Sequence, residues 1–333
     1  MITGNKVPAG GLEKAIKGLG LGETEVRFGE PLLKHTSLGI GGRADVFARP
    51  ASTGDLARIL AFDWQMPVFF LGGGTNLLVR DGNIRALFIS TGGLKGMEAP
   101  GRENENGADI TVRAGESLKG LLAFCMKNGF SGLEPLAGIP GSIGGAIAGN
   151  AGARGFSIGE VVRRVRVMGE KGEVREIRGE QMGFEYRGSA LLSGGPCPGG
   201  PCPRAGLVME AQLALQRENP AEIRAHMLSN FEMKKKTQPL SARSAGCVFK
   251  NPGGGRSAGR PSAGRLIEEA GLKGMRIGGI EVSRVHANFF INLGEGRADD
   301  FLRLMETVAD EVEKRFDIRL EPEIRILGDG FQK

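Results

Sequence analysis

The apolar and polar positions before residue 216 predict short strands interspersed with a few amphipathic helices. Apolar residues three or four positions apart indicate a helix with one buried face, whereas alternation or a short apolar run indicates a strand. Helices are predicted over 12–19, after Ser52, and after Ser117, where one face carries Leu118, Leu121, Leu122, Cys125 and Met126. Strands are predicted at 25–28, 45–48, 68–71, 77–80, 86–90, 109–113 and 207–215, with a hairpin over 161–168 and 174–177.

The remainder of the chain predicts a second, compact α+β unit that opens with a strong helix start. Asn219 supplies a capping side chain, Pro220 fits the first helical turn, and Glu222 suits the third position. This helix is predicted to run to about Lys236. The other predicted elements are a helix over 263–270, strands near Ile280 and at 289–292 and 323–327, and a helix that places Phe301, Met305, Val308 and Val312 on one face.

The length of 333 residues predicts two domains, because a single hydrophobic core rarely serves more than about 250–300 residues. We expect a lead-in segment over 1–35, a first domain over 36–215 and a second domain over 216–333.

The composition excludes several classes of protein. Apolar residues make up 40% of the chain and no run of 18 is apolar, so we expect no membrane span. The first ten residues lack the apolar core of a signal peptide, which favours a cytoplasmic protein. The net charge of +6 is spread along the chain, and one Trp and one Tyr give little platform for stacking bases, so nucleic acid is not an expected partner.

Four cysteines without an export signal indicate free thiols rather than disulfides. Cys125 lies on a predicted buried helix face. Cys197 and Cys202 fall in a Pro/Gly-rich insertion over 194–206 and suggest either a metal site or a surface loop. Because no other Cys or His nearby completes four ligands, the surface loop is favoured and no metal is expected.

Glycine is unusually frequent. It makes up 56 of the 333 residues, more than twice the average share of about 7%. Many lie in two loops, 71–77 (LGGGTNL) and 132–155, next to predicted apolar strands. Glycine loops bring backbone N–H groups close to phosphate oxygens. The first loop lacks both the P-loop ending and the G-x-G-x-x-G spacing. Two such loops suit a diphosphate-linked dinucleotide bound outside a Rossmann fold, although a tight turn without a ligand is an alternative for the first.

Seven motifs, in order along the chain, resemble the family of UDP-N-acetylenolpyruvoylglucosamine reductases. The resemblance spans about 31–328 and rests on 35–42 (HTSLGIGG), 71–79 (LGGGTNLLV), 138–146 (GIPGSIGGA), 186–189 (YRGS), 244–252 (SAGCVFKNP), 264–271 (GRLIEEAG) and 320–323 (LEPE). It implies an α+β protein with an FAD-binding domain of the vanillyl-alcohol oxidase (PCMH) type, over 36–215, and a C-terminal α+β substrate-binding domain, over 216–333. It also implies a cytoplasmic enzyme of peptidoglycan precursor synthesis that reduces UDP-N-acetylglucosamine enolpyruvate to UDP-N-acetylmuramate.

The resemblance implies FAD as cofactor, NADPH as reductant, and three FAD-lining segments that act mostly through backbone donors. The residues carried over are Thr36, Ile40, Gly41, Gly42, Gly72, Gly73, Gly74, Thr75, Asn76, Gly138, Gly141, Ser142, Gly145 and Ala146.

Three residues match the family's catalytic positions. Arg187 corresponds to the arginine that pairs with the enolpyruvyl carboxylate, for which a planar guanidinium is suited. Cys247 stands where many members have serine, and it would protonate C2 after hydride from flavin N5 adds at C3, provided that its thiol is not a standing thiolate. Glu323 matches the catalytic glutamate, and it either pairs with Arg187, is protonated, or orients a donor.

The resemblance also implies residues that hold the UDP-sugar. Tyr186, Lys235, Asn251 and His286 match such positions, with the lysine acting as a phosphate point charge. Lys234 and Lys236 leave the lysine register open. For His286 and Asn288 two interpretations stay open, lining of the same pocket or a buried structural role. Tyr186 is the only tyrosine of the chain and already belongs to the arginine motif, so the tyrosine-bearing loop of long-form members is not expected and the chain resembles the shorter form. We also expect a monomer or a weak homo-oligomer.

Two rival functions follow from the same residues. Another flavin oxidoreductase on this fold would share the glycine loops, but it would not need the motifs around Cys247 and Glu323. A non-catalytic nucleotide-binding module would not need Arg187, Cys247 and Glu323 together.

Overall fold

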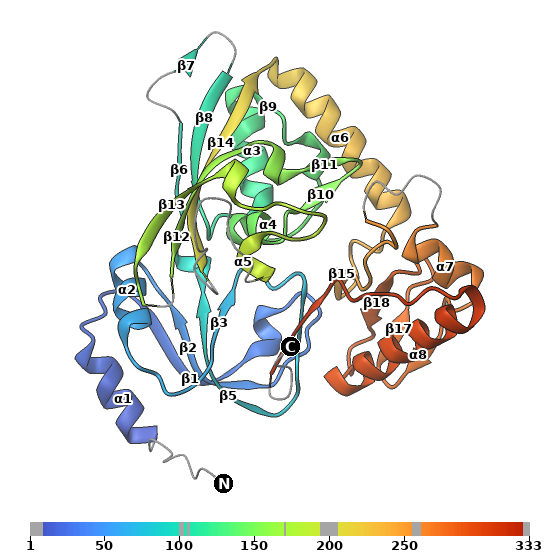
Figure 1. Cartoon of the computed structure of the whole chain (residues 1–333), viewed down its shortest axis with the longest axis horizontal. Helices are drawn as coiled ribbons and strands as arrows, with labels where there is room; N and C mark the ends of the chain where they lie inside the picture. The colour runs from blue at the N-terminus through green and yellow to red at the C-terminus, as the bar shows by residue number, and fades with distance from the viewer. Residues whose placement is uncertain are drawn as a thin grey trace.

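The computed structural model describes residues 9–99, 103–104, 107–169, 171–193, 206–254 and 261–328 (Figure 1). The predicted insertion over 194–206, with Cys197 and Cys202, therefore lies outside the described residues except for Gly206.

The first sheet is built from the N-terminal strands. Its order is β1 (Glu25–Pro31), β2 (Arg43–Arg49), β5 (Asn83–Ser90) and β3 (Val68–Leu71), and only the β1–β2 pairing is antiparallel. The predicted lead-in therefore contributes an edge strand, together with α1 (Ala9–Gly18). The predicted cap of α2 (Thr53–Ala61) is confirmed, because the Asp55 amide donates to the Ser52 hydroxyl at 3.0 Å.

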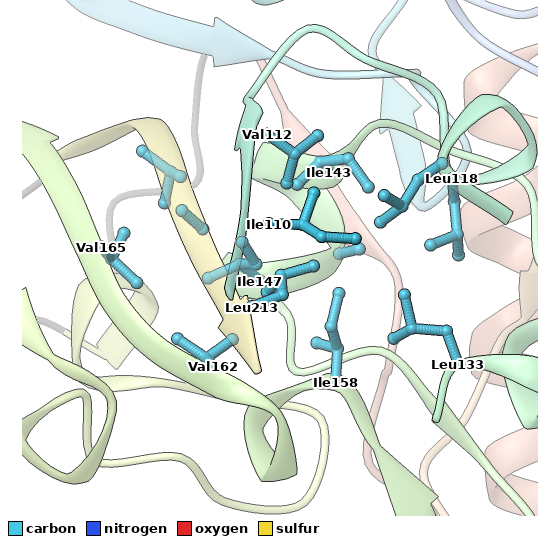
Figure 2. Close-up of a cluster of buried hydrophobic side chains, with 14 of the residues drawn as sticks. Ile110, Val112, Leu118, Leu133, Ile143, Ile147, Ile158, Val162, Val165 and Leu213 are labelled. Carbon is cyan, nitrogen blue, oxygen red and sulfur yellow. The ribbon is translucent and has the colours of Figure 1, made fainter. Parts of the chain in front are cut away.

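The second sheet is antiparallel, and helices cover one of its faces. It contains β13 (Val174–Arg178), β12 (Val162–Met168), β14 (Leu207–Arg217), β8 (Gly107–Arg113) and β6 (Met97–Glu98), with β7 (Glu103–Asn104) on β8 and β9 (Phe130–Ser131) on β14. The predicted hairpin is confirmed as β12–β13. Helix α3 (Leu118–Asn128) buries Leu118, Leu121, Leu122 and Cys125 as expected. Figure 2 shows Ile110 and Val112 of β8 facing Ile143 and Ile147 of α4 (Ile143–Ala148), with Leu213 of β14 in the same core.

Helix α4 was not predicted, because its six residues lie inside the second glycine loop. Two glycines and two alanines among its six residues give little hydrophobic periodicity. The Ser142 hydroxyl caps the helix by accepting from the Gly145 amide at 3.3 Å. The nearby hairpin of β10 (Gly152–Ala153) and β11 (Phe156–Ser157) and the short α5 (Ala190–Ser193) were also not predicted.

The C-terminal unit is a small antiparallel sheet packed on two helices. Its strands run in the order β15 (Ser244–Cys247), β18 (Phe289–Asn292), β17 (Ile280–Val282) and β16 (Arg276–Ile277), and its helices are α7 (Ala263–Glu269) and α8 (Ala298–Phe316). The predicted face of α8 is confirmed in its buried residues Phe301, Val308 and Val312. Helix α6 (Pro220–Thr237), which we expected to open this unit, packs instead against α3 and β9 of the preceding segment.

The last strand pairs with a strand of the N-terminal third of the chain. We predicted a strand over 323–327 within the C-terminal unit, but β19 covers Arg325–Leu327 and pairs in parallel with β4 (Leu77–Val79). An apolar pattern identifies a strand without identifying its partner. Because of this pairing, Glu323 is held beside the end of the first glycine loop, where the Asn76 side chain donates to its carbonyl.

Within the described residues, no helix is long and apolar enough to cross a membrane. The same residues contain no group of three or more His, Cys, Asp or Glu side chains arranged to hold a metal ion.

Candidate active site

The three segments predicted to line FAD meet in the structure. A Cβ at Gly73 would lie 2.8 Å from the Gly141 Cα, and one at Gly74, where φ is +65°, would overlap the His35 carbonyl. Only glycine allows these backbones to approach so closely. The three loops therefore form one packed cluster.

Hydrogen bonds hold these loops together. The Ser37 amide donates to the Gly74 carbonyl at 3.0 Å, and the Thr75 hydroxyl donates to the Pro140 carbonyl at 3.3 Å. The Leu118 amide at the start of α3 donates to the Gly141 carbonyl at 2.9 Å. These bonds make the loops a preorganised wall rather than independent turns.

A cavity of about 350 Å³ opens along this wall. Four predicted cofactor residues line it, Gly72, Gly73, Gly141 and Ser142, together with Arg49, Thr91, Gly92, Lys95, Gly115 and Ser117. The lining contains two cations and no carboxylate. The Arg49 Nε is buried without a hydrogen-bond partner among the described residues. A donor-rich, positively charged wall fits the diphosphate of FAD.

Other predicted cofactor residues serve the loops themselves. The Thr36 hydroxyl donates to the Ile40 carbonyl at 2.8 Å, and the Gly42 amide donates to the Arg80 carbonyl at 2.8 Å. The Asn76 amide group donates to the Glu323 carbonyl at 3.1 Å. Side-chain contacts of Thr36 and Asn76 with FAD therefore stay predictions. The same applies to contacts of Ile40, Gly41, Gly138, Gly145 and Ala146.

Arg187 is held in a strained turn. Its φ is +58°, in the left-handed region that non-glycine residues seldom adopt, and reciprocal amide–carbonyl bonds between Glu185 and Gly188 close the turn at 3.1 and 3.2 Å. Such strain persists only where the surroundings enforce it, and it often occurs in active sites. The turn directs the guanidinium to Glu323, with 2.6 Å between Arg187 Nε and Glu323 Oε1.

Glu323 and Cys247 come together across β15. The Glu323 amide donates to the Val248 carbonyl at 2.7 Å, so the two backbones are adjacent, and the Glu323 carboxylate is close enough to raise the pKa of the Cys247 thiol. Cys247 itself pairs with Phe289 in the sheet and accepts a hydrogen bond from the Asn288 side chain. The Asn288 amide group is fixed by two further bonds with the Phe249 backbone, at 2.8 and 2.9 Å. Asn288 therefore has a structural role towards Phe249 and also contacts the candidate proton donor.

The electrostatics keep Cys247 protonated. Burial, followed by the negative charge of Glu323, raises the pKa of the thiol to about 12, although Arg187 and Asn288 act in the opposite direction. The thiol therefore carries its proton at neutral pH, which meets the condition that sequence reasoning set for a proton donor. Burial also raises the pKa of Glu323, while Arg187 lowers it.

The structure directs Lys234, rather than the predicted Lys235, towards this cluster. Lys234 is buried and its Nζ donates to the Ala137 carbonyl at 2.8 Å, whereas Lys235 and Lys236 are exposed. Burial, followed by the positive charges of Arg154 and Arg187, lowers the pKa of Lys234 to about 8. Helix periodicity could have identified it, because Lys234 follows the buried Ile223 by 11 residues, which is close to three turns.

Comparison with known proteins decides the family. Residues 44–178 match the FAD binding domain family, and residues 238–327 match the C-terminal domain of UDP-N-acetylenolpyruvoylglucosamine reductase. The chain is 37% identical over 324 residues to the UDP-N-acetylenolpyruvoylglucosamine reductase of Bacillus subtilis, covering 95% of this chain and 99% of that protein. It belongs to the UDP-N-acetylenolpyruvoylglucosamine reductase family.

The structural comparison agrees. The crystal structure of the Thermus caldophilus UDP-N-acetylenolpyruvylglucosamine reductase superposes with a TM-score of 0.72 at 33% identity, over 91% of this chain and 98% of that one. A second relative, the reductase of Bacillus velezensis, is 38% identical over 90% of this chain and 93% of its own. The chain is thus an FAD-dependent oxidoreductase with the activity of this family, a step of peptidoglycan precursor synthesis. The predicted fold class, an FAD-binding domain with a family-specific C-terminal domain, is confirmed.

The residues predicted to bind the substrate do not all lie in one cluster. Tyr186 joins the catalytic cluster, with its ring centre 5.2 Å from the Arg187 guanidinium carbon. The Asn251 side chain caps α7 by accepting from the Ala263 amide at 3.1 Å. The charged neighbours of His286 are Lys273 and Glu268 rather than Arg187. The Asn251 backbone also hydrogen-bonds to Tyr186, which places Asn251 beside the catalytic cluster. Substrate contacts of Asn251 and His286 remain predictions.

Proposed function

We propose that this reductase converts UDP-N-acetylglucosamine enolpyruvate to UDP-N-acetylmuramate with Cys247 as the proton donor. The supporting observation is a half-buried, protonated thiol beside the Arg187–Glu323 pair, at the end of the cofactor loops. Bound FAD, reduced by NADPH, supplies the hydride that adds to C3 of the enol ether. The residues of this chain then have to bind the carboxylate, stabilise charge on C2 and deliver one proton to it.

Arg187 binds the enolpyruvyl carboxylate in this proposal. Its Nε edge contacts Glu323, and a guanidinium has a second donor edge formed by its two terminal nitrogens. That edge suits a bidentate bond to a carboxylate. Negative charge that develops at C2 is shared with this carboxylate, so the same cation stabilises it. Of the three roles left open for Glu323, pairing with Arg187 is the one that this contact supports.

Cys247 completes the reaction by protonating C2. Its S–H bond breaks as the C2–H bond forms, and the thiolate that remains accepts the Asn288 hydrogen bond and recovers a proton from water. A thiol with a pKa near 12 is far more acidic than a C–H bond next to a carboxylate, so the transfer is downhill. The cytoplasmic location, the shorter form and the monomeric or weakly associating state stay predictions.

An anaerobic visible spectrum tests the reaction itself. We expect NADPH to bleach the flavin absorbance of the purified protein and the UDP-sugar enol ether to restore it in the absence of oxygen. Bleaching without restoration by this substrate would indicate a different flavin oxidoreductase on the same fold. Absence of a flavin spectrum, even after FAD is added, would indicate a module without redox chemistry.

Lys234 provides a test of the substrate site. In this proposal its ammonium pairs with the diphosphate of the UDP-sugar, and that positive charge is lost near pH 8 in the free enzyme. We expect the KM for the UDP-sugar to rise as pH increases through about 8, since the deprotonated amine cannot pair with the diphosphate. Lys234→Met should raise KM about 10- to 100-fold at pH 7, the value of one charge-assisted hydrogen bond, and remove this pH dependence.

Lys235→Met is the matched control, since Lys235 is exposed on the same helix. It should leave KM and its pH profile unchanged. If Lys235→Met raised KM and Lys234→Met did not, the register assigned here would be wrong.

A further inference from the structure

The cavity beside the glycine loops has a wall that the motifs do not account for. Arg49, at the end of β2, and Lys95 supply its charge, while Thr91, Gly92, Gly115 and Ser117 complete that side. None of these residues belongs to the segments predicted to line FAD. They share one cavity with Gly72 and Gly141, and their presence there needs a separate explanation.

Arg49 is incompletely satisfied in the structure. Its Nη1 lies 3.3 Å from Glu25, but its Nε is buried and has no hydrogen-bond partner in the described part of the chain. A buried donor on a charged group that lacks an acceptor is costly, by more than the net value of an ordinary hydrogen bond. A ligand oxygen in the cavity would remove that cost.

Two glycines allow the backbone segments around Arg49 to approach each other closely beside the cavity. A Cβ at Gly93 would overlap the Pro50 carbonyl, and one at Gly115 would overlap the Thr91 carbonyl. These glycines bring the turn Thr91–Gly93 (η2) against the end of β2 and the start of α3. Lys95, two residues beyond that turn, is exposed at the cavity, and its ammonium has no ion pair with the described carboxylates.

We propose that Arg49 and Lys95 bind the diphosphate of FAD together with the backbone donors of the glycine loops that line the same cavity. The cavity is continuous with Gly72 and Gly73, and three residues after Gly73 the same loop bonds to Glu323. Four residues of extended chain span at most roughly 14 Å. A flavin laid along this loop would have its diphosphate within reach of the two cations and its ring near the Arg187–Glu323 pair.

The alternative anions are the phosphates of NADPH and of the UDP-sugar. Both have to approach the reacting cluster from solvent, whereas this cavity lies on the far end of the cofactor loop from that cluster. The inference rests on FAD as the cofactor and does not depend on the proton-donor role of Cys247.

The test is the affinity of the full-length apoprotein for FAD and for riboflavin, which lacks the diphosphate, measured by quenching of flavin fluorescence. Arg49→Met and Lys95→Met should each raise the Kd for FAD about 10-fold or more, and the double variant about 100-fold or more, at low salt. The Kd for riboflavin should change by less than about twofold, and the salt dependence of FAD binding should become weaker.

Two controls separate this role from a structural one. Glu25→Gln breaks the ion pair of Arg49 but leaves its charge, so FAD binding should be unchanged or tighter. Arg85→Met removes an exposed arginine of β5 that does not line the cavity, so FAD binding should be unchanged. Wild-type FAD affinity in the double variant would overturn the proposal, as would equal losses for FAD and riboflavin. A raised KM for NADPH or the UDP-sugar with unchanged FAD affinity would assign the cavity to that ligand instead.

Discussion

Cys247→Ala is expected to slow product formation by at least about 100-fold, the typical contribution of a positioned acid, while NADPH still bleaches the flavin. The two half-reactions separate because the thiol acts only when C2 takes its proton, after the hydride has left the flavin. The measurement is anaerobic stopped-flow absorbance, with flavin reduction by NADPH and flavin reoxidation by the UDP-sugar recorded separately. Unchanged reoxidation in the alanine variant would remove Cys247 from the mechanism.

Cys247→Ser is the matched control, since it keeps a proton donor of similar size at the same place on β15. We expect it to retain much more activity than the alanine variant, because either group can deliver a proton to C2. If serine proved as inactive as alanine, the acidity of the thiol would be decisive rather than the presence of a donor. Both variants should bind FAD with wild-type affinity, since Cys247 does not line the cofactor cavity.

Arg187→Lys is expected to lower kcat/KM for the UDP-sugar by about 100-fold or more, the value of a lost charged bidentate contact. Lysine keeps the positive charge but cannot contact Glu323 along one edge and the substrate carboxylate along the other. The loss should appear in flavin reoxidation, while reduction by NADPH stays near the wild-type rate. Equal losses in both half-reactions would indicate a general distortion of the site.

The same residue predicts a change in pH dependence. Arg187 lowers the pKa of Glu323, which burial has already raised. In Arg187→Met this effect on the pKa of Glu323 is absent, so Glu323 should keep its proton to a higher pH. The acid limb of the kcat/KM profile should therefore shift to higher pH. Arg284→Met, an exposed arginine paired with Glu281 in the C-terminal unit, should leave the profile unchanged.

Much of the fold could be predicted from local sequence patterns. The caps at Ser52, Ser117 and Asn219 and the apolar faces of α3 and α8 are local signals, since each depends on residues within a few turns. Helix α4 was missed for the opposite reason, because its short glycine-rich segment is held in place by contacts with β8 and β14 rather than by its own periodicity.

The candidate site was accessible only in part. Motif spacing identified Arg187, Cys247 and Glu323, but the residues of one lysine run cannot be told apart until the helix face is known, and Lys234 proved to be the buried one. Arg49 and Lys95 carry no motif at all. Their relation to the glycine loops exists only because the end of β2 and the turn before Lys95 are packed together through glycines.

Residue type and local spacing were enough to predict the long helices and most of the longer strands, the positions of the glycine loops and the resemblance to the family. They were not enough for α4, α5 or the β10–β11 hairpin. The tertiary structure alone decided that β19 pairs with β4, that Glu323 consequently meets Arg187 and Cys247, and that the thiol stays protonated. Strand partners and burial are set by contacts between residues far apart in the chain. No local pattern contains that information, and the pKa values of the site depend on it.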